Sequence, residues 1–135
     1  MYSQQQQRYL SEAVETASPA ARLVMIYDRL LLDLNRAEKA CLQGDIAAAH
    51  YALVHAQQIV GVLSDTLDLS VWEGAQGLQD LYEYIYGELI KANLSKSAIT
   101  VGSIIAVVRP LAAAWHEAAA TLAGATLVGQ TSGVA

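Results

Sequence analysis

The sequence has a single cysteine and few basic residues. Cys41 cannot close a disulfide within the chain, and the polar amino terminus lacks the apolar core of a secretory signal. We therefore expect a reducing, cytoplasmic location. Eight lysines and arginines stand against thirteen acidic residues, and the net charge is −5. The basic residues are scattered from Arg8 to Arg109 without forming a stripe, which argues against nucleic acid as a partner.

Long uninterrupted apolar runs are also missing. The longest apolar stretch, residues 98–115, contains Gly102, Ser103, Arg109 and Pro110. It falls short of the about 18 to 20 continuous apolar residues of a membrane span. We expect no membrane insertion.

The residues that are abundant favour helices. Hydrophobic residues make up 54% of the chain, the mean hydropathy is +0.29, and alanine supplies much of both, which favours tightly packed helices over a sheet. Glycine and proline are too sparse for a disordered chain, and 135 residues suffice for one domain with a single core. We predict an all-α protein.

Capping signals divide the chain into elements. Ser18 and Pro19 suit the start of a helix, whereas Gly44 suits the end of one and Asp45 can cap the next. The predicted helices span about 19–43, 45–67, 75–93 and 97–122. A short helical or extended cap segment (1–17) precedes this bundle (18–123), and a flexible tail (124–135) follows it. Such short junctions predict an antiparallel four-helix bundle.

Pro110 lies inside the last predicted helix. A proline removes one backbone hydrogen bond and crowds the carbonyl of Ala106, so we expect a kink at residues 106–109. The β-branched residues 104–108 could instead form a buried strand. No other segment offers a strand to pair with it, and a helix is the prediction we keep.

The sequence offers no residues for catalysis or metal binding. His50 and His55 point to different sides of one helix, and no histidine has the preceding glutamate of a di-iron bundle. A phosphotransfer role lacks a basic neighbour after His55. No phosphate-binding loop or nucleophile motif occurs, and the acidic side chains, Asp33 among them, are expected to be solvated. We expect a protein that is not an enzyme and binds no metal or cofactor.

Residues 78–94 have helical periodicity but are apolar on more than one side. One stripe holds Leu78, Tyr82, Ile85 and Leu89. Three further apolar residues widen it: Leu81, Tyr86 and Ile90. This surplus fits a bulky core, a homodimer face, or a groove that receives an amphipathic segment of another chain. The pattern alone leaves these alternatives level.

A series of short motifs resembles the FliS family of flagellar secretion chaperones. In chain order they are Tyr9 with Val14, Thr16-Ala-Ser-Pro19, Leu23-Val-Met-Ile-Tyr-Asp28, Gly44-Asp45, Leu67-Asp68, Leu78-Gln-Asp-Leu-Tyr-Glu-Tyr84, Ala92-Asn93-Leu94 and Ala114-Trp115. Each motif is weak alone, but their order and spacing over residues 9–118 are specific.

The resemblance implies a cytosolic chaperone without enzymatic activity. Its client would be the disordered carboxy-terminal region of flagellin, which it would keep from premature assembly and help deliver to the flagellar type III export apparatus. The apolar pattern offers these groove residues: Ile59, Leu63, Tyr82, Tyr86, Ile104, Val107 and Leu111. Tyr9 and Val14 are candidate gate residues over the groove, unless they serve in ordinary packing. We expect a monomer or weak homodimer, and the alternative is a helical adaptor or dimerisation bundle without flagellin specificity.

Overall fold

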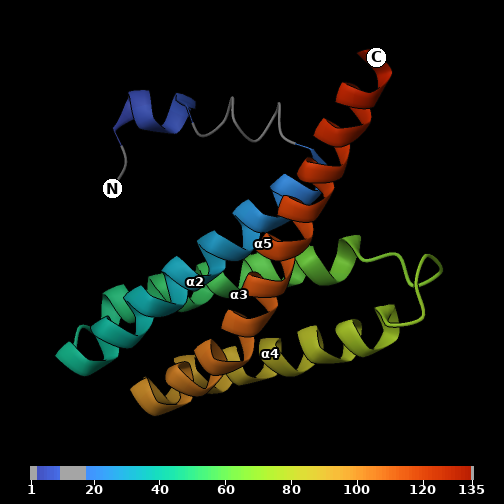
Figure 1. The fold of residues 1–135 in the computed structure, drawn as a ribbon. Helices are drawn as coiled ribbons and strands as arrows, with labels where there is room; N and C mark the ends of the chain where they lie inside the picture. The colour runs from blue at the N-terminus through green and yellow to red at the C-terminus, as the bar shows by residue number, and fades with distance from the viewer. Residues whose placement is uncertain (1–2, 10–17, 135) are drawn as a thin grey trace. The chain divides into compact units, whose positions relative to one another are not determined.

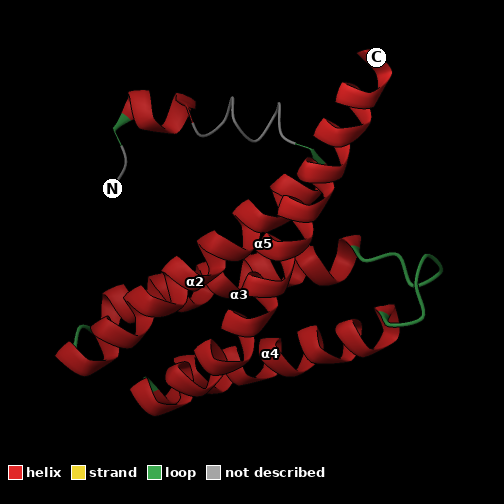
Figure 2. Cartoon of the chain, viewed as in Figure 1, coloured by secondary structure: helices red, strands yellow, loops and turns green. Residues whose placement is uncertain are grey.

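The computed structural model describes residues 3–9 and 18–134, and the elements in this part of the chain are helices joined by turns (Figure 2). Residues 4–9 form a short helix. Four long helices follow it: α2 (Pro19–Gln43), α3 (Ile46–Thr66), α4 (Ala75–Ser95) and α5 (Ala98–Val134) (Figure 1). The prediction of an all-α protein is confirmed.

Three of the four long helices, α2, α3 and α5, begin where the sequence places capping residues. Ser18 Oγ accepts a hydrogen bond from the backbone N–H of Ala21 at 3.2 Å, and Asp45 Oδ1 accepts one from Ala48 at 3.1 Å. Ser97 Oγ does the same for Thr100 at 3.2 Å. Each bond satisfies a backbone donor that lacks a partner in the first helical turn. Gly44, at φ +70°, adopts the left-handed conformation that ends α2.

The last helix is longer than the sequence suggested. Its predicted end at residue 122 is wrong, because α5 continues to Val134 and includes much of the segment expected to be a flexible tail. One glycine costs about 1 kcal/mol in a helix, so Gly124 does not by itself end one. No proline follows Pro110 to stop it.

The chain divides into two compact units. The core unit is Arg29–Arg109, and the terminal unit combines Met1–Asp28 with Pro110–Ala135. The boundary within α5 falls at Pro110, where the helix loses a backbone hydrogen bond. The kink expected at residues 106–109 stays a prediction.

Within the core unit, parts of all four helices pack as an antiparallel bundle around one apolar core. The largest fully buried apolar side chains of this unit are Leu30, Leu34, Leu53, Val60, Ile85, Leu89, Val101 and Val108. Each contributes about 1.5 to 3 kcal/mol by leaving water. Alanines of α3 lie between these larger residues and let the helices approach closely: Ala49, Ala52 and Ala56. The stripe of Leu78, Tyr82, Ile85 and Leu89 is buried, as its spacing predicted.

Asp33 lies inside this core, so the expectation that it is solvated was wrong. Its side chain is 1% exposed and is the only buried charged group in the described part of the chain. Oδ2 contacts Nδ1 of His55 on α3, and Oδ1 lies 3.2 Å from Nε of Arg29. A buried carboxylate is tolerated when such partners replace its lost water.

The terminal unit has its own contacts. The rings of Tyr27 and Trp115 pack at a tilt, with centroids 6.4 Å apart. Next to each in sequence, Asp28 Oδ1 lies 2.7 Å from Nε2 of His116. These pairs join the first part of α2 to the second part of α5.

Among the described residues, two helices are long and apolar enough to cross a membrane by length and composition, namely α3 and residues Ala98–Gly124 of α5. The sequence suggested that the segment from residue 98 falls short of a membrane span, but by this measure it does not. A helix of a bundle passes the same test in part because its buried face must be apolar, and here 33% and 28% of the two windows is buried. In α5 that face includes Val101, Ile105 and Val108. The absence of membrane insertion stays a prediction.

Candidate partner-binding site

The seven predicted groove residues differ widely in exposure. Three are buried, with exposed fractions of 4% for Leu63, 3% for Tyr82 and 3% for Ile104. Three are half-buried: Ile59, Val107 and Leu111. Tyr86 is 41% exposed. Leu111 lies in the terminal unit, and the other six lie in the core unit.

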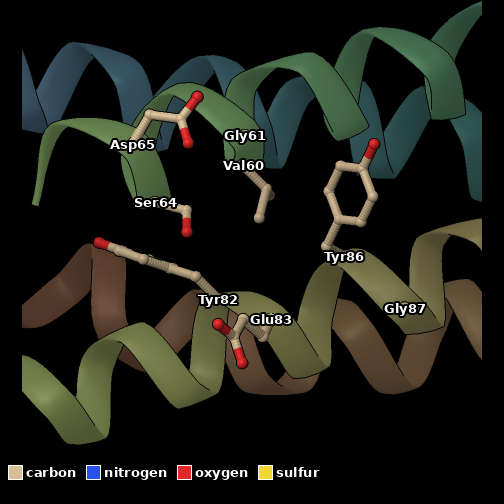
Figure 3. Close-up of a pocket in the computed structure, with 8 residues that line it drawn as sticks. All are labelled: Val60, Gly61, Ser64, Asp65, Tyr82, Glu83, Tyr86 and Gly87. Atoms are coloured by element: carbon tan, nitrogen blue, oxygen red, sulfur yellow. The ribbon is translucent and has the colours of Figure 1, made fainter.

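A hollow of about 460 Å³ opens between α3 and α4 (Figure 3). We call it the α3–α4 pocket. Its walls are formed by Val60, Gly61, Ser64 and Asp65 from α3, and Tyr82, Glu83, Tyr86 and Gly87 from α4. Of the predicted groove residues, it brings together Tyr82 and Tyr86.

The two walls are built with the same spacing. Each helix contributes residues i, i+1, i+4 and i+5, which share one face of an α-helix. On α3 the set starts at Val60, and on α4 it starts at Tyr82. The buried members of this face, Val60 and Tyr82, form the floor. In Figure 3 the Tyr86 ring extends from α4 toward α3 at one end of the pocket.

Gly61 and Gly87 leave room that other residues would fill. A Cβ atom built at either position would meet no atom within 4 Å, so close packing does not demand glycine there. A glycine inside a helix costs about 0.5 to 1 kcal/mol relative to alanine. Because these two positions carry no side chain, both walls of the pocket have open space.

The polar groups of the pocket are anionic or neutral. Ser64 Oγ accepts a hydrogen bond from Nε2 of Gln79 at 2.7 Å. The carboxylates of Asp65 on α3 and Glu83 on α4 have no hydrogen-bond or ion-pair partner in the described part of the chain. No lysine, arginine or histidine is among the residues that line it. The charged residues that line the pocket are therefore all acidic.

Sequence reasoning missed six of the eight lining residues: Val60, Gly61, Ser64, Asp65, Glu83 and Gly87. A signal existed in the glycines, since isolated glycines inside two adjacent helices often mark close approach or open space. The charged lining residues, Asp65 and Glu83, could not be found from apolar periodicity, because that pattern considers apolar residues alone.

Of the two candidate gate residues, the structure describes only Tyr9. Tyr9 lies in the helical segment 4–9 and is 71% exposed. Val14 lies outside the described residues. A gate role for either stays a proposal.

The histidines are engaged in pairs rather than gathered in one cluster. Nδ1 of His50 lies 3.1 Å from Nδ2 of Asn93, and His55 and His116 contact Asp33 and Asp28. Within residues 3–9 and 18–134, no three histidine, cysteine or acidic side chains are placed to hold a metal ion. Burial raises the pKa of the Cys41 thiol, an effect that nearby Lys96 partly offsets, so its thiolate is disfavoured.

Comparison with known proteins gives a consistent result. A family model described as "Flagellar protein FliS" matches residues 1–122. The flagellar secretion chaperone FliS of Salmonella typhimurium is 30% identical over 110 residues, covering 80% of this chain and 82% of that protein. The Bacillus subtilis protein of the same name is 26% identical over 110 residues, covering 82% of each. A crystal structure of a bacterial flagellar chaperone has the same fold, with a TM-score of 0.71 at 18% identity, covering 85% of this chain and 94% of that one.

Proposed function

Because the chain belongs to the FliS family of flagellar proteins, we propose that it is a cytosolic export chaperone for flagellin. It binds the disordered carboxy-terminal region of flagellin, prevents premature polymerisation and assists delivery to the flagellar type III export apparatus. The family match over residues 1–122 carries this proposal. A chaperone family points to a role in binding rather than catalysis.

The physical chemistry of the bundle supports binding of this kind. A disordered segment that folds into helices on an apolar surface buries a large area, while the cost of ordering it keeps release feasible. Large apolar side chains of α4 are exposed outside its buried stripe, and two of them, Tyr86 and Ile90, stand four residues apart on one face of the helix. They offer the kind of surface that receives an amphipathic helix.

The groove residues take two roles in this proposal. In the core unit, Tyr86 and the half-buried Ile59 and Val107 would contact the client, and the half-buried Leu111 of the terminal unit would make a contact of its own. The buried Leu63, Tyr82 and Ile104 would support that surface from beneath.

Titration calorimetry with a peptide of the flagellin carboxy-terminal region tests the function. We expect binding with a large negative heat-capacity change, and a gain of helicity in circular dichroism. A peptide of the same composition in scrambled order is the control. No binding at micromolar concentration would overturn the proposal. A stable dimer in sedimentation, with no binding, would favour the adaptor alternative.

The gate has a separate test. If the amino-terminal segment with Tyr9 and Val14 covers the client surface, deleting residues 1–15 should tighten flagellin binding, because displacement no longer costs free energy. Replacing Tyr9 by alanine in the full chain should do the same to a smaller extent. Unchanged affinity in both variants would reject the gate and leave the chaperone function intact.

A further inference from the structure

We infer that the α3–α4 pocket is a specificity pocket for a basic side chain, a lysine or arginine, presented by the helical client. This inference rests on the proposed function. The apolar pattern alone describes the client-binding surface of this chain as hydrophobic. The inference adds that one position of the client must be positively charged.

The charge of the pocket selects a cation. Asp65 on α3 and Glu83 on α4 stand on opposite walls, and neither has an ion-pair or hydrogen-bond partner among the described residues. The other two carboxylates of α4 are already engaged, since the exposed Asp80 accepts a hydrogen bond from Gln76 and the half-buried Glu88 pairs with Lys91. The two carboxylates of the pocket are thus free to accept charge-assisted hydrogen bonds.

The shape of the pocket selects a long side chain. A basic side chain packs its methylene stem on apolar surface and keeps its charged head at the rim. Val60 and the tyrosines supply the apolar surface, and the Tyr86 ring can also face the cation. A volume of about 460 Å³ lies at the lower end of the range of roughly 300 to 1,000 Å³ for ligand pockets, which suits one side chain and the backbone that presents it.

The glycines let the client backbone approach. Because Gly61 and Gly87 carry no side chains and face open space, a helix laid along the α3–α4 seam can come close enough for its side chain to reach the floor. A metal ion is a poorer occupant, since the described residues place no third carboxylate, histidine or cysteine with these two.

The experiment pairs variants of the full-length chain with variants of the flagellin peptide. Asp65→Asn with Glu83→Gln removes the charge of the pocket and keeps its shape. The matched control is Glu73→Gln with Glu117→Gln, two exposed acidic residues outside the pocket, which changes the net charge equally. On the peptide, each lysine and arginine is replaced in turn by methionine.

We expect the pocket variant to bind the native peptide about 5 to 10 times more weakly, and the control variant to bind within about twofold of wild type. One methionine peptide should lose affinity for wild type yet bind the pocket variant no worse than the native peptide does. Equal weakening in both double variants, or no weakening in either, would overturn the basic-residue pocket and leave the chaperone function standing. If wild type binds no flagellin peptide, both proposals fall.

Discussion

His55 on α3 contacts the buried carboxylate of Asp33 on α2 through its Nδ1 atom. The contact joins two helices inside the core unit, and Arg29 approaches the other carboxylate oxygen from one turn earlier on α2. The Arg29 N–H at Nε is buried without a well-directed hydrogen bond, so this second contact is an ion pair alone. His55 is therefore the partner that satisfies Asp33 best.

Replacing His55 by alanine should lower the free energy of unfolding by about 1 to 3 kcal/mol, because it leaves a buried carboxylate short of a partner. The double variant His55→Ala with Asp33→Leu should be more stable than His55→Ala alone, since it also removes the buried charge. Urea denaturation followed by circular dichroism measures both. His50→Ala, at an exposed site, is the control, and an equal loss there would contradict the special role of His55.

Tyr82 and Tyr86 should respond differently to truncation although they stand four residues apart. Tyr82 is buried, so Tyr82→Ala should cost about 3 kcal/mol or more of stability. Tyr86 is partly exposed beside the pocket, so Tyr86→Ala should cost less than about 1 kcal/mol and mainly weaken flagellin binding. Urea denaturation and calorimetry separate the two quantities. Tyr51→Ala, at an exposed site on α3 outside the pocket, should change neither greatly.

Gly61→Ala and Gly87→Ala should each raise the free energy of unfolding by about 0.5 to 1 kcal/mol, because alanine is a better helix former and its Cβ meets nothing within 4 Å. Both should weaken flagellin binding by filling the pocket. Gly77→Ala is the matched control, since Gly77 is helical, equally unhindered and outside the pocket. It should stabilise the fold without affecting binding. Pocket variants that bind as tightly as the control would argue against occupation of this site.

Asp68 predicts a pH dependence in the loop between α3 and α4. The Ser70 side chain and backbone N–H donate to its carboxylate at 2.6 and 2.9 Å, and these bonds hold the pKa of Asp68 below its ordinary value. Because the folded-state pKa is the lower one, the stabilisation is present above the unfolded-state pKa of about 3.9. It is lost as the pH falls through the folded-state pKa.

Ser70→Ala should therefore raise the pKa of Asp68 toward its ordinary value, which carboxyl-carbon NMR titration would show. The variant should be less stable than wild type at pH 7, and the difference should shrink once Asp68 is protonated in both proteins. A difference that persists unchanged at low pH would mean that Ser70 acts through another contact.

The sequence predicts the starts of the helices well, because capping is local. Ser18, Asp45 and Ser97 each bond to a backbone N–H three residues away, so the signal and its cause lie in one short window. The end of α4 was harder to place. Lys96 takes the left-handed conformation there without being glycine, and its Nζ donates to Asn93 Oδ1 at 2.7 Å.

The candidate site could not be predicted in the same way. Whether an apolar residue such as Ile104 or Tyr82 faces the core depends on which helices pack against it, and periodicity gives only the faces that are apolar. The burial of Asp33 depends on His55, which lies on the next helix. A contact between residues that are far apart in the sequence is not indicated by the residues next to either of them, so it cannot be predicted from a local pattern.

The glycines on the two walls of the pocket also affect how the helices open. Turns around an interior glycine are the weaker parts of a helix, so local unfolding of α3 and α4 should be easiest near Gly61 and Gly87. A client seated there would add contacts to those same turns. Occupancy of the pocket and protection of these amides from hydrogen exchange should therefore rise together, and release of the client would return both helices to their looser state.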